Sequence, residues 1–109
     1  MNMDLQFINE LDELNNEGIF VRHNLNSICY VCGFDYTSDK PWGEDGESPD
    51  QSGCVCCGVQ FGYEDLTVQN LVDYRKKWLS TGARWINESF RPEHWSFEKQ
   101  FVNVPMKYR

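Results

Sequence analysis

The sequence of 109 residues lacks any run of about 18 apolar residues, the length that a helix needs to cross a membrane. Its first residues, MNMDLQFINELDEL, have no basic cluster and carry acidic side chains where a secretory signal peptide is apolar. We therefore expect a cytoplasmic protein, in which thiols stay reduced. That compartment favours metal binding or catalysis over disulfides as the role of the five cysteines.

The sequence also lacks the common catalytic motifs. GxGxxG, the P-loop, HExxH and GxSxG are all absent. The two histidines, His23 and His94, are isolated in the sequence. Adjacent acidic residues such as Glu64 and Asp65 would point to opposite faces of a strand, so we interpret this pair as charges ahead of a helix. These absences predict a protein that is not an enzyme.

Basic residues are scarce in the first part of the chain. Residues 1–65 contain 13 acidic and 2 basic residues, whereas residues 66–109 contain 4 acidic and 8 basic ones, and the net charge is −7. An acidic half repels phosphates and so argues against nucleic-acid binding. The basic second half keeps nucleic-acid binding open as an alternative.

The spacing of apolar residues predicts two main helices and a short third one. Within residues 4–16, apolar side chains recur at helical intervals, at Leu5, Ile8, Leu11 and Leu14. A second helix is expected over 67–81, with Thr67 as its N-cap and Gly82 after its end. The segment HWSFEKQFVNV after Pro92 predicts the short third helix.

Residues 19–63 consist of short apolar stretches separated by turns. IFVRH, ICYVCGFDY and VCCGVQFGY are typical of short strands, and Asp45-Gly46 marks a turn between them. The sequence thus predicts an α+β fold, in which a small zinc-ribbon-like antiparallel β core over about 19–63 is packed by the N-terminal helix and the helix near 67–81. We expect residues 1–109 to form a single zinc-binding domain. Five aromatic side chains are expected at the junction of ribbon and helix: Phe61, Tyr63, Trp78, Trp85 and Trp95.

Four of the cysteines belong to two C-x-x-C-G units, and they are Cys29, Cys32, Cys54 and Cys57. In each unit a tight turn would direct both sulfurs to one point, and the glycine can adopt the positive φ that closes the turn. Two such units complete a tetrahedral Zn²⁺ site with no open position. The sequence therefore predicts a structural zinc ion whose binding contributes to folding.

The fifth cysteine, Cys56, has two interpretations. It is a small apolar residue packed near the zinc, which we favour, or a reactive thiol with a lowered pKa beside the cluster. A thioredoxin-like redox pair is not expected, because no βαβ unit surrounds either C-x-x-C.

The loop before the second unit, PWGEDGESPD, is acidic and contains one tryptophan. We expect Trp42, Glu44, Asp45, Glu47 and Asp50 to bind a basic partner protein, with Trp42 as an exposed anchor, although a core position for Trp42 is the alternative. A nucleic-acid-degrading toxin is such a partner, because it must be basic to hold phosphates. We therefore favour a non-enzymatic immunity protein. The alternatives are an accessory zinc ribbon that binds nucleic acid and an enzyme that uses a thiol or zinc.

The run PWGEDGESPDQSGCVCCGVQFGYEDLT, followed by YRKKWLSTGARW and RPEHW, resembles a family of small bacterial cysteine-rich proteins with a C-P-C-C-G motif. The resemblance extends from about Cys29 to Trp95. Val55 stands where the family usually has proline, which stiffens the turn, so zinc loss should be easier here although no ligand is removed. The resemblance implies a compact cytoplasmic metal-binding domain with no established enzymatic activity and with accessory or immunity roles.

Overall fold

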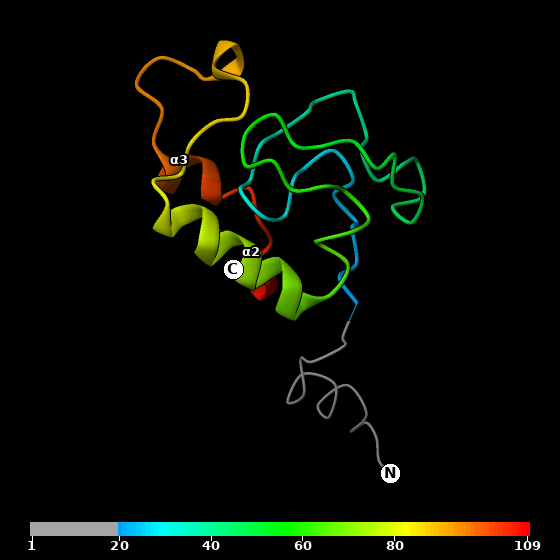
Figure 1. Ribbon diagram of the computed structural model, residues 1–109. Helices are drawn as coiled ribbons and strands as arrows, with labels where there is room; N and C mark the ends of the chain where they lie inside the picture. The colour runs from blue at the N-terminus through cyan, green and yellow to red at the C-terminus, as the bar shows by residue number, and fades with distance from the viewer. Residues whose placement is uncertain (1–19) are drawn as a thin grey trace.

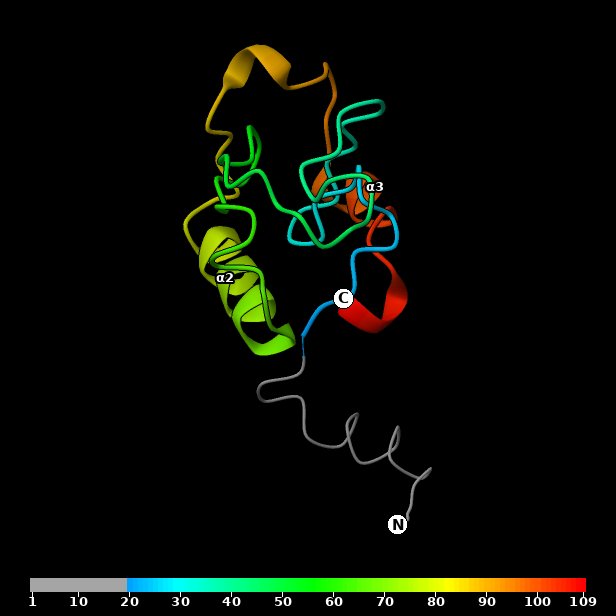
Figure 2. The ribbon, with the colours of Figure 1, turned by 90° about the vertical axis from the view of Figure 1, so that its right-hand side faces the viewer.

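The computed structural model describes residues 20–109 (Figure 1). The helix expected at 4–16 lies outside these residues. The described part contains two α-helices and two short 3₁₀ helices: α2 (Val68–Ser80), η1 (Glu88–Phe90), α3 (Phe97–Phe101) and η2 (Met106–Tyr108). In Figure 1, α2 and α3 lie next to each other on one side of the loops, and the rings of Trp78 and Phe97 pack edge-on with 5.6 Å between their centroids. Figure 2 gives a second view, with α2 at the left. Among the described residues, no helix is long and apolar enough to cross a membrane.

The predicted antiparallel β core is absent from residues 20–109, so the zinc-ribbon-like fold class is wrong for this part of the chain. Only three isolated antiparallel bridges form there: Phe20–Thr67, Ile28–Asp35 and Gly53–Gln60. The last two bridges each close one cysteine turn. Pairing stops beside them because Thr37 and Gln51 have φ values of 58° and 64°, a conformation that a strand cannot continue.

The core gathers around the cysteine turns instead of around a sheet. Tyr30 and Val31, from the first turn, are fully or almost fully buried, as are Val59 and Phe61, which follow the second turn. From the C-terminal segment, the side chain of Val104 is also fully buried. The apolar stretches that were interpreted as strands therefore supply core residues without forming a ladder.

The helix predicted over 67–81 is present as α2. The Thr67 hydroxyl accepts a hydrogen bond from the Asn70 amide at 3.2 Å, which caps the first turn. Gly82, with φ +104°, follows the end of the helix. Leu71 and Trp78 are buried on the face of α2 that packs against the core. The short third helix is present as α3.

Three of the five aromatic residues expected at the junction are buried, namely Phe61, Trp78 and Trp85. Trp95 is half-buried and packs edge-on against Trp85, with 5.4 Å between the ring centroids. Tyr63 is 69% exposed and does not belong to the junction.

Trp42 lies in the core beneath the acidic loop, with only 5% of its surface exposed. Its ring stacks on His23 at a centroid distance of 3.7 Å, and its Nε1 donates to an Asp65 carboxylate oxygen at 3.2 Å. Burial lowers the pKa of His23 to about 3 and raises the pKa of Asp65 to about 6. The imidazole is therefore neutral at pH 7, and the indole joins the base of the loop to the rest of the core.

Because Trp42 is buried and hydrogen-bonded, we expect Trp42→Ala to lower the free energy of unfolding by about 3–5 kcal/mol. The exposed aromatic residue Tyr63 provides the control, and Tyr63→Ala should change stability by no more than about 0.5 kcal/mol. Denaturant unfolding of both variants measures the difference. Equal stability of the two variants would contradict the core position of Trp42.

Candidate metal centre

The two C-x-x-C-G units fold into the same tight turn. In each, the amide of the first cysteine donates to the carbonyl five residues later, and the glycine amide donates to the carbonyl of the first cysteine, at distances of 2.7–2.9 Å. Gly33 and Gly58 have φ values of +87° and +86°, as the predicted turns require. These bonds orient both cysteine side chains of each turn toward the other turn.

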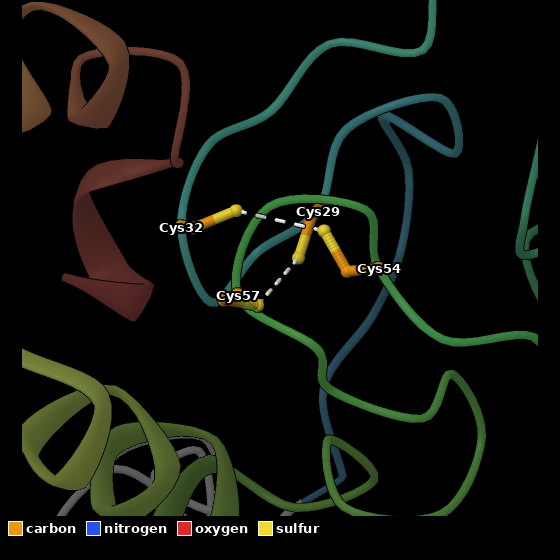
Figure 3. Close-up of side chains that lie close together, drawn as sticks. All are labelled: Cys29, Cys32, Cys54 and Cys57. Atoms are coloured by element: carbon orange, nitrogen blue, oxygen red, sulfur yellow. Dashed lines mark hydrogen bonds between the residues drawn. The ribbon is translucent and has the colours of Figure 1, made fainter. Parts of the chain in front are cut away.

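Four sulfur atoms converge between the two turns (Figure 3). The Sγ atoms of Cys29 and Cys57 lie 3.8 Å apart, as do those of Cys32 and Cys54. All four sulfurs lie within 4.8 Å of one another, so this group could hold a metal ion. The structure thus brings together all four residues that were predicted as ligands.

The site is closed to solvent, because the four cysteines are only 0–3% exposed. Burial raises the pKa of the Cys29, Cys32 and Cys57 thiols, since a thiolate loses its hydration there. At Cys54, hydrogen bonds from the neighbouring thiols outweigh the effect of burial and lower the pKa. A bound cation is the group that would stabilise four thiolates in such a place.

Polar side chains from distant parts of the chain support the turns. Gln100, in α3, donates to the carbonyl of Cys32 at 3.0 Å, and Tyr74, in α2, donates to the carbonyl of Cys57 at 3.1 Å. The hydroxyl of Tyr36 accepts from the Val55 amide at 3.0 Å. None of these three side chains was predicted to support the site, because no spacing rule connects them to the cysteines.

Arg75 follows Tyr74 in α2 and is 5% exposed. Its Nε donates to the carbonyl of Val31 at 2.8 Å, and its Nη2 donates to the carbonyls of Tyr30 and Tyr108 at 2.8 and 2.6 Å. The guanidinium carbon lies 4.7 Å from the centre of the Phe101 ring. Burial lowers the pKa of Arg75, whereas negative charge on the cysteines raises it. This basic residue therefore belongs to the core and not to the surface.

Cys56 does not join the four converging sulfurs. Its side chain is fully buried, and its Sγ lies 3.5 Å from the Nε2 of Gln100. Its amide donates to the Sγ of Cys54 at 3.4 Å. This environment agrees with the interpretation of Cys56 as a packed residue beside the site.

The four acidic residues predicted to bind a partner, Glu44, Asp45, Glu47 and Asp50, are all exposed. Asp45 and Asp50 each accept hydrogen bonds from a backbone amide and from a serine hydroxyl, at distances of 2.7–3.0 Å. These bonds lower the pKa of Asp45 and shape the loop. Glu44 pairs with Lys40 at 3.0 Å. Trp42 was also predicted to bind the partner, but its side chain is buried in the core and does not belong to this surface.

A comparison of the chain with protein-family models, curated proteins and solved structures finds no match.

The glycines of the two turns should differ in their tolerance of substitution. A Cβ atom at Gly33 would collide with the backbone carbonyl of Gln100, whereas one at Gly58 would meet the Ile86 side chain at 2.9 Å, which can move. Both variants place alanine at positive φ, which costs about 1–3 kcal/mol. We expect Gly33→Ala to be the more destabilising in denaturant unfolding. A larger loss in Gly58→Ala would contradict this packing of α3 on the first turn.

Proposed function

We propose that the protein binds one zinc ion per chain and that the ion holds the fold together. The observation that carries this proposal is the convergence of the four sulfurs of Cys29, Cys32, Cys54 and Cys57. A tetrahedral ion with bonds of about 2.3 Å to sulfur separates its ligands by about 3.8 Å, and two of the sulfur pairs lie at 3.8 Å. Four thiolates in this arrangement are typical of zinc or iron.

The closure of the site favours a structural role over a catalytic one. A catalytic zinc keeps a position for water or substrate, whereas four protein ligands leave none. The near-complete burial of the cysteines also gives a substrate no route to the ion. A zinc-dependent enzyme is therefore the less well supported alternative, and the two cysteine turns are better explained as a clamp.

Protein purified without chelators should contain one zinc per chain by native mass spectrometry. Zinc binding contributes on the order of 10 kcal/mol to such sites at pH 7, so Cys29→Ser should lose both the metal and cooperative unfolding. The control is Cys56→Ala, which should keep the metal and lose about 1 kcal/mol of stability.

Three results would refute parts of this proposal. A folded protein that contains no metal would refute the claim that an ion holds the fold together, and one iron per chain would refute zinc. Loss of the metal in Cys56→Ala would refute the assignment of the four ligands.

We further propose that residues 43–50 bind a basic partner protein, with a nucleic-acid-degrading toxin as the partner class and immunity as the role. The support is that the acidic side chains are exposed and that the hydrogen bonds of Asp45 and Asp50 preorganise the loop. Complementary charge would speed association with a basic surface. The resemblance to the bacterial cysteine-rich family points to the same role.

Nucleic-acid binding has weaker support. Arg75 is buried and donates to backbone carbonyls, so it does not contribute to a basic surface of residues 66–109. Phosphate contacts need basic side chains that are free to reach the nucleic acid.

Reversing the charges of Glu44 and Glu47 tests partner binding by the loop and leaves in place Asp45 and Asp50, whose hydrogen bonds shape it. Glu44→Lys with Glu47→Lys should slow association with a partner captured from the native cell by about 10-fold or more, and higher salt should slow the wild type. The control, Glu93→Lys with Glu98→Lys, makes the same charge change at exposed positions elsewhere. Binding kinetics at two salt concentrations measure both effects. A partner that is not basic, or equal effects of the two double variants, would contradict the proposal.

A further inference from the structure

We infer that Arg75 is a positioning residue of the metal centre and that its guanidinium balances the negative charge of the metal–thiolate group. This inference rests on the proposed metal binding. Two features of Arg75 carry it, namely where its hydrogen bonds go and where its charge lies.

The hydrogen bonds of Arg75 hold the first cysteine turn directly. Tyr30 and Val31, which accept two of these bonds, are the two residues between Cys29 and Cys32. A guanidinium has a rigid, planar arrangement of donors, so two neighbouring carbonyls are held at once. The orientation of both cysteine side chains in the first turn therefore depends on one residue of α2.

Helix α2 reaches both turns through consecutive residues. Tyr74 donates to the carbonyl of Cys57 in the second turn, and Arg75 donates to carbonyls in the first. The next residue, Lys76, is exposed and contributes a positive charge to the surface only. The position of Arg75 on α2 therefore places its charge beside the first cysteine turn, whereas the charge of Lys76 lies at the surface.

The charge of Arg75 has no carboxylate partner among residues 20–109. Its hydrogen-bond acceptors there are three backbone carbonyls, and the two ion pairs of this part of the chain involve Lys40 and Arg91. A buried charge without a counter-charge is costly. A divalent ion with four thiolates carries a formal charge of −2, and two of these thiolates flank the carbonyls that Arg75 binds. The metal–thiolate group is therefore the counter-charge for Arg75.

Cobalt(II) is a suitable probe, because its bonds to thiolates give charge-transfer absorption. Arg75→Met should weaken Co²⁺ binding by about 10–100-fold in competition with a chelator, the loss typical when a residue supporting metal ligands is removed. Loss of the positive charge should also move the charge-transfer bands to longer wavelength. Lys76→Met, which removes the same charge one residue away, should bind Co²⁺ like the wild type.

Arg75→Lys separates the charge from the hydrogen bonds, since lysine keeps the charge but lacks the planar donors. We expect it to keep the wild-type band position, because the charge remains, and to recover only part of the Co²⁺ affinity, because the two carbonyls of the first turn lose their planar donors. A wild-type protein that binds neither Co²⁺ nor Zn²⁺ would refute the proposed function itself. If the wild type binds Co²⁺, equal affinities of Arg75→Met and Lys76→Met would overturn the inference. Charge-transfer bands of Arg75→Lys that move as far as those of Arg75→Met would overturn the charge balance, and wild-type affinity in Arg75→Lys would overturn the positioning by hydrogen bonds. If Arg75→Met does not fold, the band position and the Co²⁺ affinity of Arg75→Lys, each compared with the wild type, test the inference in its place.

Discussion

The convergence of four sulfur atoms from two turns is the constraint on which the described part of the structure depends. Cys29 and Cys54 begin turns that are far apart in the sequence, and no β-ladder joins them. Outside α2 and α3, most hydrogen bonds of the described backbone close local turns. A metal ion bound by all four thiolates would hold two such turns together.

The protein surrounds this centre with side-chain hydrogen bonds to backbone carbonyls. Tyr74 and Arg75 bind the turns from α2, and Gln100 binds from α3. Buried backbone carbonyls need hydrogen-bond donors, and these carbonyls do not belong to a β-ladder that would supply them. The three side chains donate the hydrogen bonds instead. The same arrangement explains why the core of the described residues contains a buried arginine. It also leaves the acidic loop as a separate surface above Trp42.

The sequence predicted the cysteine turns and α2 well, because both follow local rules. A glycine after C-x-x-C indicates positive φ, and a threonine before an apolar periodic stretch indicates a helix start. The β core was wrong because short apolar stretches look alike whether they pair or merely fill a core. Trp42 could not be assigned from sequence, since its burial depends on His23 and Asp65 closing around it. The hydrogen bond from Gln100 to the carbonyl of Cys32 could not be predicted either, because the two residues are 68 positions apart in the sequence.

The central claim is that one ion bonds to all four sulfurs. X-ray absorption at the zinc edge of the purified protein tests this claim most directly. The account predicts four sulfur neighbours at about 2.3 Å and no nitrogen or oxygen in the first shell. Three or fewer sulfurs, or a nitrogen or oxygen ligand at about 2.0–2.2 Å, would contradict a closed four-cysteine centre.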